Sequence, residues 1–302
     1  MKHKQTGRRI KDCASDRALY AVVNVLLALM MLLVAYPLLN ILSSSFSSPR
    51  AVSTGRVVLL PVEFSLLGYQ TVFAHRLIGI AYRNTIFYSL AGTLINLTMV
   101  LTCAYPLSRR DFPLRSPLMI ACLITMYFSG GLIPSYILMV QLGLINNVWA
   151  MLLPGALSVY NMILTRTYIL SNVPVELLEA SQIDGCSDAR YFTAVLLPLC
   201  KPIIAVVALY SVVGHWNSYF NALIYLNDQQ LFPLQLILRQ ILISSEINPS
   251  DMGDIEGAIA KQGLSDLLKY ALIVVATAPI LCVYPFLQRF FVKGVMIGSV
   301  KG

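Results

Sequence analysis

The chain has 302 residues, of which 57% are hydrophobic and only 12% are charged. A soluble domain carries about 25% charged residues, so this composition excludes an ordinary soluble enzyme and favours a membrane bundle. The formal net charge of +8 does not indicate a nucleic-acid-binding face. The basic residues lie between apolar stretches, where the topology of a membrane protein accounts for them.

Five stretches without Asp, Glu, Lys or Arg are long enough to cross a bilayer, which takes about 20 apolar residues. They are residues 18–49, 84–108, 116–165, 202–227 and 270–288. The third is far too long for one span and must turn back, and its glycine and paired asparagines favour a turn at 141–147. The sequence therefore predicts an all-α integral membrane protein with six transmembrane helices.

An even number of spans places both ends of the chain on the same side of the membrane. Lys and Arg are about twice as frequent in the segments that would then face inward as in those that would face outward. This bias predicts that the N and C termini are cytoplasmic. The expected organisation is a cytoplasmic N-terminal segment over 1–17, a membrane domain over 18–290 and a cytoplasmic C-terminal tail over 291–302.

Two predicted outer segments are long. Residues 43–79 are rich in Ser, Pro and Gly, and residues 228–269 combine six acidic residues with an apolar stretch at 231–238. A loop of such length usually has a function, although a disordered hairpin is the alternative.

The segment 171–198 lies on the predicted cytoplasmic side, between the fourth and fifth spans. Pro174 suits the first position of a helix, with Ser171 or Asn172 near its cap. Gly185 fits the left-handed residue that ends such a helix.

Beyond the glycine, Ser187 can cap a second short helix that stops before Pro198. The two helices would form a compact elbow that is rigid enough to transmit a movement. The glycine between them would let another backbone approach closely.

The elbow resembles the EAA motif of ABC importer permeases, which runs Glu-Ala-Ala, three residues, Gly, nine residues, Ile-x-Leu-Pro. Here Glu179-Ala180-Ser181 is followed by Gly185 and by Val195-Leu196-Leu197-Pro198 at the same spacing. Only Ser and Val depart from the pattern, and both changes are conservative. The resemblance implies that the elbow couples the chain to a separate ATPase subunit through Glu179, Ala180, Ser181, Asp184, Gly185 and Pro198.

Other segments resemble carbohydrate permeases of the maltose type, and among them the MalG/LplC-like branch that handles oligosaccharides or polysaccharide fragments. They are residues 128–134, 149–155, Trp216-Asn217 and 291–302. The resemblance implies the type I ABC importer permease fold and a multi-pass location in the bacterial cytoplasmic (inner) membrane. It further implies a second permease, an ABC ATPase dimer, an extracytoplasmic solute-binding protein and a sugar substrate. A second ATPase contact through Gly294, Gly298 and Gly302 of the tail is expected by the same resemblance.

No phosphate-binding pattern G-x-x-x-x-G-K-[ST] occurs in the sequence, so ATP and Mg²⁺ belong on the partner ATPase. We expect no cofactor, metal or catalytic residue on this chain, which is a transport subunit and not an enzyme. The alternatives are the permease of a non-sugar ABC importer and an ion-coupled secondary transporter. The second usually places ionisable residues within its spans, whereas the five windows hold no carboxylate.

Span five is interrupted by polar and aromatic residues, among them Trp216, Asn217, Tyr219 and Asn221. In a continuous helix Asn217 and Asn221 share a face. These side chains suit a sugar path, because amides bind hydroxyls and aromatic rings stack on sugar faces. Hydrogen bonds between helices, or an aromatic belt near the outer interface, explain them equally well.

Overall fold

The computed structural model describes residues 13–245 and 262–282, and every regular element in these two ranges is a helix. The chain divides into two units. The described part of the first unit comprises residues 13–69 and 262–274, and that of the second comprises 70–245 and 275–282.

The first unit begins with the long helix α1 (Ala14–Ser45), whose apolar side chains are nearly all exposed. A helix that is apolar all round suits lipid or the surface of another membrane subunit. After α1 the chain folds back through α2 (Pro49–Ser53). The amide of Asn40 donates hydrogen bonds of 3.1 and 3.0 Å to the carbonyls of Val57 and Val58, which gives this irregular backbone partners.

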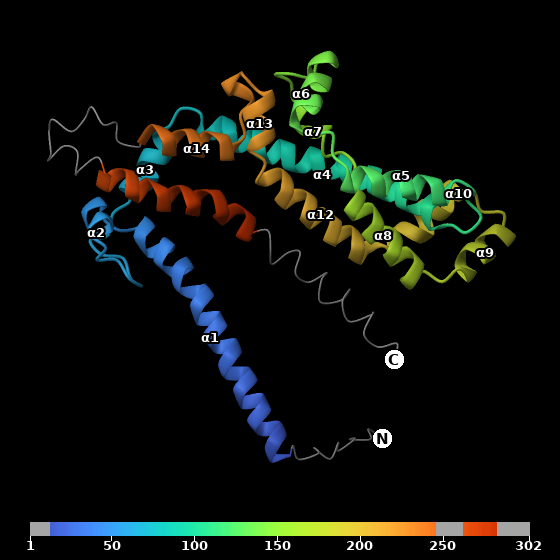
Figure 1. The fold of residues 1–302 in the computed structure, drawn as a ribbon, viewed down its shortest axis with the longest axis horizontal. Helices are drawn as coiled ribbons and strands as arrows, with labels where there is room; N and C mark the ends of the chain where they lie inside the picture. The colour runs from blue at the N-terminus through green and yellow to red at the C-terminus, as the bar shows by residue number, and fades with distance from the viewer. Residues whose placement is uncertain (1–12, 246–261, 283–302) are drawn as a thin grey trace. The chain divides into compact units, whose positions relative to one another are not determined.

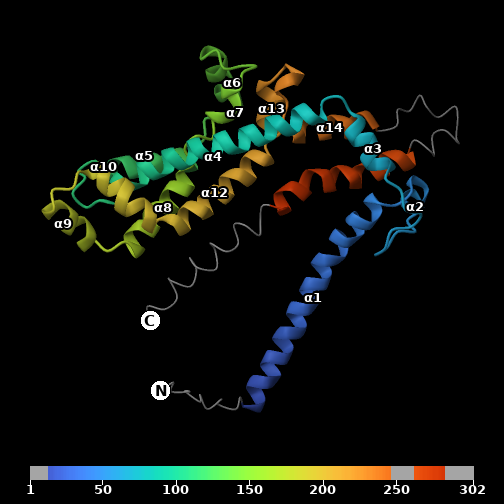
Figure 2. The same cartoon turned by 180° about the vertical axis from the view of Figure 1, so that it is seen from behind.

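The second unit begins within α3 (Leu67–Ala74) and is built on α4 (Ile78–Ser108), α8 (Val159–Asn172) and α12 (Lys201–Trp216), which lie side by side in Figures 1 and 2. Their common core is formed by Val100, Ala104, Leu107, Met162, Ile169, Ile203 and Val207. Close approach of α4 and α12 depends on Gly92, because a Cβ there would lie 2.3 Å from Nε2 of His215.

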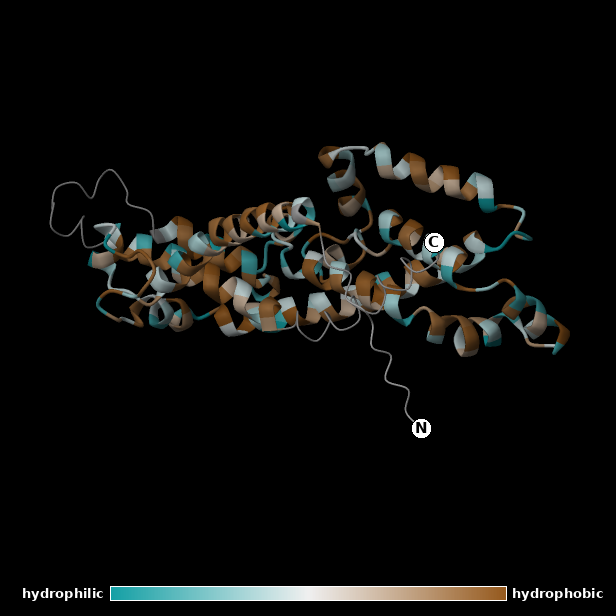
Figure 3. Ribbon diagram, turned by 90° about the horizontal axis from the view of Figure 1, so that it is seen from below, coloured by the Kyte–Doolittle hydropathy of each residue, from teal (hydrophilic) through white to brown (hydrophobic). Residues whose placement is uncertain are grey.

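Three described helices are long and apolar enough to cross a membrane: Ser15–Ser45, Ile78–Ser108 and Gln262–Cys282. Two bent pairs raise the number to five: α5 (Arg115–Tyr127) with α6 (Leu132–Gln141), bent by 112°, and Asp188–Leu199 with α12, bent by 80°. Apolar residues run along the helices, and hydrophilic ones gather at helix ends and connections (Figure 3). The all-α membrane architecture is thus confirmed, whereas the count of six spans stays a prediction.

The predicted turn at 141–147 is confirmed, since the chain leaves the helical conformation between α6 and α7 (Trp149–Leu152). A second break at 128–131 was not predicted. Gly131 adopts φ +88°, a left-handed conformation that glycine reaches without steric cost, and it turns the chain from α5 into α6.

Span five is not the continuous helix that the sequence predicted. Helix α12 ends at Trp216, and a separate helix, α13 (Phe220–Tyr225), follows. The amide of Asn217 donates to the carbonyl of Val213 at 3.0 Å and stabilises this end. The shared helical face expected for Asn217 and Asn221 is therefore wrong.

The described parts of the predicted outer loop over 228–269 are largely helical. They contain the short helix η2 (Gln229–Leu231), α14 (Leu234–Ser245) and the start of the Gln262–Cys282 helix. The apolar stretch 231–238 is mostly buried because it packs as core. Residues 246–261 lie outside the described residues, as do the N-terminal segment up to residue 12 and the tail glycines Gly294, Gly298 and Gly302.

Side chains of α4 hold the irregular segment before α14. Asn84 donates to the carbonyls of Gln230 and Phe232 at 2.6 and 3.1 Å. The hydroxyl of Tyr88 donates to Leu231 O at 2.9 Å. A neighbouring helix therefore satisfies these backbone carbonyls, as buried backbone groups require.

We expect Gly92→Ala to lower the stability of the protein by about 1–3 kcal/mol, because the new methyl group overpacks the contact with His215. Gly214→Ala is the matched control, since a Cβ at that helical glycine meets no atom within 4 Å. Thermal unfolding of the purified protein in detergent measures both variants. Equal melting temperatures for the two would contradict the packing role of Gly92.

Candidate functional site

The first helix of the elbow is α9 (Glu176–Ile183), which carries Glu176 and Glu179 in its first turn. It begins two residues later than the sequence predicted. Val173 adopts an extended conformation because it precedes Pro174, and this ends α8. Ser171 and Asn172 accordingly belong to the last turn of α8 and do not cap α9.

The predicted hinge of the elbow is confirmed. Gly185 adopts φ +71°, in the left-handed region. The chain closes there with a hydrogen bond of 2.9 Å from Cys186 N to Ser181 O. Ser187 caps α10 (Asp188–Tyr191), since its hydroxyl accepts from Arg190 N at 3.4 Å.

The second helix does not stop before Pro198, contrary to the prediction. From α10 the chain continues through a π-helical turn, η1 (Phe192–Leu196), into α11 (Leu197–Leu199). Proline lacks an N–H donor, and π turns are one of the ways in which helices adjust near such a residue. The bend falls instead at Cys200, just before α12.

The elbow has an inner face and an outer face. The residues of the inner face pack against the core of α4, α8 and α12 and are Leu178, Cys186, Tyr191, Phe192 and Val195. The exposed residues of the outer face include Glu176, Glu179, Ala180, Asp184 and Gly185. Ile183 is 86% exposed at the end of α9. An exposed apolar side chain beside exposed polar residues suits contact with another protein.

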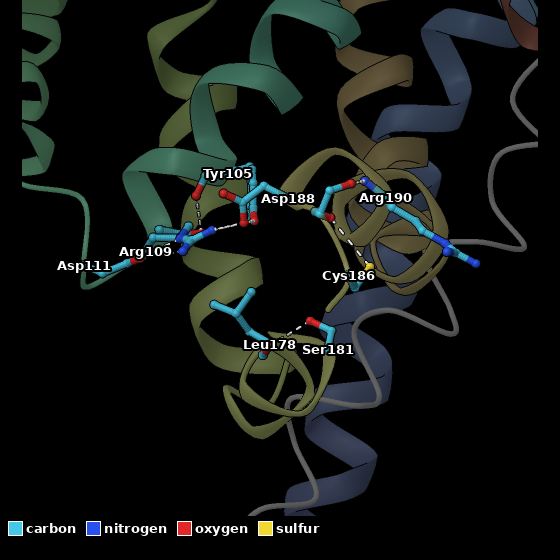
Figure 4. Close-up of polar contacts among 10 residues, drawn as sticks. Tyr105, Arg109, Asp111, Leu178, Ser181, Cys186, Asp188 and Arg190 are labelled. Carbon is cyan, nitrogen blue, oxygen red and sulfur yellow. Dashed lines mark hydrogen bonds and ion pairs between the residues drawn. The ribbon is translucent and has the colours of Figure 1, made fainter. Parts of the chain in front are cut away.

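Arg109 ties the elbow to the end of α4 (Figure 4). Its guanidinium makes ion pairs with Asp188, at the start of α10, and with Asp111. It also donates to the hydroxyl of Tyr105 at 3.0 Å. Hydrogen bonds from Arg109 hold the pKa of Asp111 below its ordinary value. The side chain of Arg109 is only 13% exposed, so this cluster is a partly buried tie between two elements.

The sequence analysis did not single out Arg109 or Asp188. The available signals were a basic residue just after an apolar span and an acidic residue in the first turn of a short helix. Neither pattern identifies the partner, because the two residues are separated by 79 positions in the sequence.

The four residues predicted for the substrate path do not gather at one site. Trp216 is buried, and its indole donates to Ala276 O at 2.9 Å. Asn217 caps its own helix, and the guanidinium of Arg239 lies 5.2 Å from the ring centre of Tyr219. Of these four residues, Asn221 alone lines the cavity of about 260 Å³ beside the break between α12 and α13.

That cavity draws on α4, α7, α8, α12 and α13. It is lined by Asn96, Met151, Gly155, Ser158, Asn161, Tyr210, Ser211, Gly214, His215, Ser218 and Asn221. The sequence analysis missed most of these residues. Single Asn and Ser residues within apolar spans were the available signal, but their convergence depends on how the helices pack.

The sequence matches the family of binding-protein-dependent transport system inner membrane components over residues 14–297. The chain belongs to this family. It is therefore a transport subunit of an ABC importer in the inner membrane, where its apolar helices make it a multi-pass protein.

Two relatives come from Bacillus subtilis (strain 168). The polygalacturonan/rhamnogalacturonan transport system permease protein YtcP is 38% identical over 90% of this chain and 94% of its own length. Protein LplC is 40% identical over 88% of this chain and 89% of its own length.

A solved structure is also similar to the chain. It is a chain from the crystal structure of a bacterial ABC transporter involved in the import of the acidic polysaccharide alginate. The TM-score is 0.82 at 33% identity, covering 93% of this chain and 99% of that one. The type I ABC permease fold expected from the sequence is thereby confirmed.

We expect Arg109→Ala to loosen the elbow, because it leaves Asp188 without its ion pair. Because the side chain of Asp188 is 67% exposed, the pair contributes roughly 0.2–1 kcal/mol, so amide hydrogen exchange in α9 and α10 should rise by up to about fivefold. Arg110→Ala removes an exposed neighbouring charge and is the matched control. Exchange that is equally slow in both variants would show that the tie does not hold the elbow.

Proposed function

We propose that the chain is the permease subunit of a binding-protein-dependent ABC importer for oligosaccharides or polysaccharide fragments. The observation that carries the proposal is the helix–glycine–helix elbow with the EAA spacing, which presents Ile183 and the carboxylates of Glu176, Glu179 and Asp184 outward. The sugar class is supported by the likeness to YtcP and to the alginate importer.

In this function α9 docks in a cleft of the ATPase dimer, which holds ATP and Mg²⁺. Glu179, Ala180, Ser181, Asp184 and Gly185 form or shape the docking surface. Closure of the ATPases moves the elbow, and the packed inner face and the Arg109 cluster pass the movement to α4 and α12. Pro198 helps set the geometry with which the elbow joins α12.

The proposed topology has six spans with cytoplasmic termini. Three are the helices Ser15–Ser45, Ile78–Ser108 and Gln262–Cys282, and the other three are the bent pair of α5 and α6, α7 with α8, and α12. The segments 1–17, 171–198 and 291–302 lie on the cytoplasmic side. Of these, 171–198 is the coupling loop. The tail adds an ATPase contact through Gly294, Gly298 and Gly302.

On the outer side, residues 228–269 form an arm for the solute-binding protein. Within this segment α4 holds α14 in place. The sugar released by the binding protein passes between this chain and a second permease. Asn221 and its neighbours Trp216, Asn217 and Tyr219 contribute to that path or to its walls.

The coupling role predicts that Gly185→Val abolishes the stimulation of ATP hydrolysis by the loaded binding protein while the complex stays in the membrane. Valine is strained at φ +71°, so the elbow changes shape. Gly185→Asn is the matched control, because asparagine tolerates the left-handed conformation and should keep most of the stimulation. Normal stimulation in the valine variant of the reconstituted complex would refute the coupling role.

The topology predicts that single cysteines at Gln5 and Val300 resist an impermeant maleimide in intact cells, whereas one at Ser250 reacts. The six native cysteines are first replaced by serine. Adding excess loaded binding protein should slow labelling at position 250 several-fold, because the docked protein covers the arm. Labelling at either terminus from outside would overturn the orientation, and unchanged labelling at position 250 would exclude docking on this part of the arm.

A further inference from the structure

We propose that the segment 57–64, which we call the return loop, is an apolar anchor that inserts into the lipid surface at the end of α1. The proposal concerns the first unit and does not depend on which substrate the importer carries. The return loop follows α2 and lies beside the last turns of α1 (Figure 1). In the proposed topology this lipid surface belongs to the outer leaflet of the membrane.

The return loop exposes a run of apolar side chains although it is not a helix. Leu60 is 77% exposed and Phe64 is 70% exposed, and Val58 and Leu59 are each about half exposed. The ring of Phe64 stacks on that of Phe46, the residue just after α1, with 5.9 Å between the ring centres. Single exposed apolar side chains need no explanation, whereas a run of them marks a surface that an apolar partner covers.

The return loop is fastened to α1 at the level where that helix leaves the hydrocarbon. Arg17 is the last charged residue before the apolar run of α1, and about 20 residues from it cross the core, which then ends near Pro37. The amide of Asn40 and the hydroxyl of Ser43, about one turn further on, donate to the carbonyls of residues 57–59 at 3.1, 3.0 and 2.6 Å. The return loop therefore lies at the boundary between acyl chains and headgroups.

The backbone of the return loop has partners that an apolar environment demands. Besides the three carbonyls bound by α1, the N–H of Val62 donates to the hydroxyl of Ser47 at 3.0 Å, and its carbonyl accepts from the N–H of Ser48 at 3.2 Å. Pro61 has no N–H to satisfy. Water would pair such groups on a solvated loop, whereas lipid cannot, so protein partners are required there. The pairing therefore suits a loop that touches lipid.

The charged residues at the two ends of the apolar run are paired with each other. The guanidinium of Arg56 lies 2.6 Å from one carboxylate oxygen of Glu63, and the hydroxyl of Ser48 donates to the other at 2.6 Å. Glu63 adopts φ +53°, a left-handed conformation that strains a residue with a side chain. The strained turn brings the carboxylate to these partners, so no unpaired charge accompanies the exposed apolar side chains.

Lipid fits this surface better than a protein partner does. A protein interface carries about one hydrogen bond per 100–200 Å², whereas the carbonyls of residues 57–59 and both backbone groups of Val62 are already paired within the unit. The return loop also continues an apolar surface of α1, where Leu38, Leu39 and Leu42 are about half exposed or more. Since α1 is long and apolar enough to span the membrane, lipid that covers its last turns reaches the return loop.

The test places a nitroxide spin label on Leu60→Cys in the complete complex in proteoliposomes, after the six native cysteines and those of the other subunits have been replaced by serine. Collisions of the label with oxygen, which concentrates in the bilayer, are compared with collisions with a water-soluble nickel chelate. Because the side chain of Leu60 is largely exposed, the substitution leaves the packing of the unit intact. Ser53→Cys, at an exposed position of α2 in the same unit, is the matched control.

We expect the ratio of oxygen collisions to nickel collisions at position 60 to exceed the ratio at position 53 several-fold. Adding excess loaded binding protein should leave it unchanged. Equal ratios at the two positions would place the return loop in water and overturn the proposal. Few collisions with either reagent at position 60 would overturn it as well, because the second permease or the binding protein would then cover the loop. The measurement needs no transport, so its failure is distinct from a failure of the proposed function.

A second variant tests whether the apolar side chain itself makes the anchor. With the label on Phe64→Cys, Leu60→Asp should lower the collision ratio several-fold, because a carboxylate is costly in lipid and draws the loop towards water. Leu60→Met keeps an apolar side chain of similar size and should keep the ratio. An unchanged ratio in the aspartate variant would show that Leu60 does not hold the loop in lipid and would overturn the anchor. Should the aspartate variant fail to assemble, the label at position 60 decides.

Discussion

The structure depends on one constraint: a chain that interrupts its helices must give hydrogen-bond partners to the buried backbone groups that each interruption leaves unpaired. Helix α4 supplies many of them. Its side chains hydrogen-bond the segment before α14, the connection before α8 and, through Tyr82, the carbonyl of Val275. The shorter helices are thus anchored to one unbroken helix of 31 residues.

The same helix contacts three regions of the second unit along its length. Near its start Asn84 and Tyr88 hold the base of α14, near its middle Asn96 borders the cavity, and just beyond its end Arg109 holds the elbow. A rigid helix with discrete side-chain contacts along its length can pass a displacement from one end to the other. This arrangement gives a physical route by which a movement of the elbow would reach the cavity beside α12.

Polar side chains also gather where a helix is interrupted. The cavity lies at the end of α12, where the chain stops forming the regular hydrogen bonds of a helix and Ser218 and Asn221 follow. In a continuous helix the backbone groups would be hydrogen-bonded within the helix, and the same side chains would be distributed around its surface. The interruption instead brings uncharged polar groups from several helices to one place.

The sequence alone determined the membrane class, the all-helical architecture and the elbow, because these follow from local physics. Apolar length decides insertion, the glycine at position 185 permits a left-handed turn, and Ser187 caps the helix behind it. The EAA spacing indicated the family for the same reason, since it is contiguous in the chain. The tertiary structure decided where span five breaks, how the arm is anchored and which polar residues meet. Asn84 contacts a segment 146 residues away and Arg109 one 79 residues away. No local pattern reveals such partners, because the packing of the helices selects which polar side chain satisfies which exposed group.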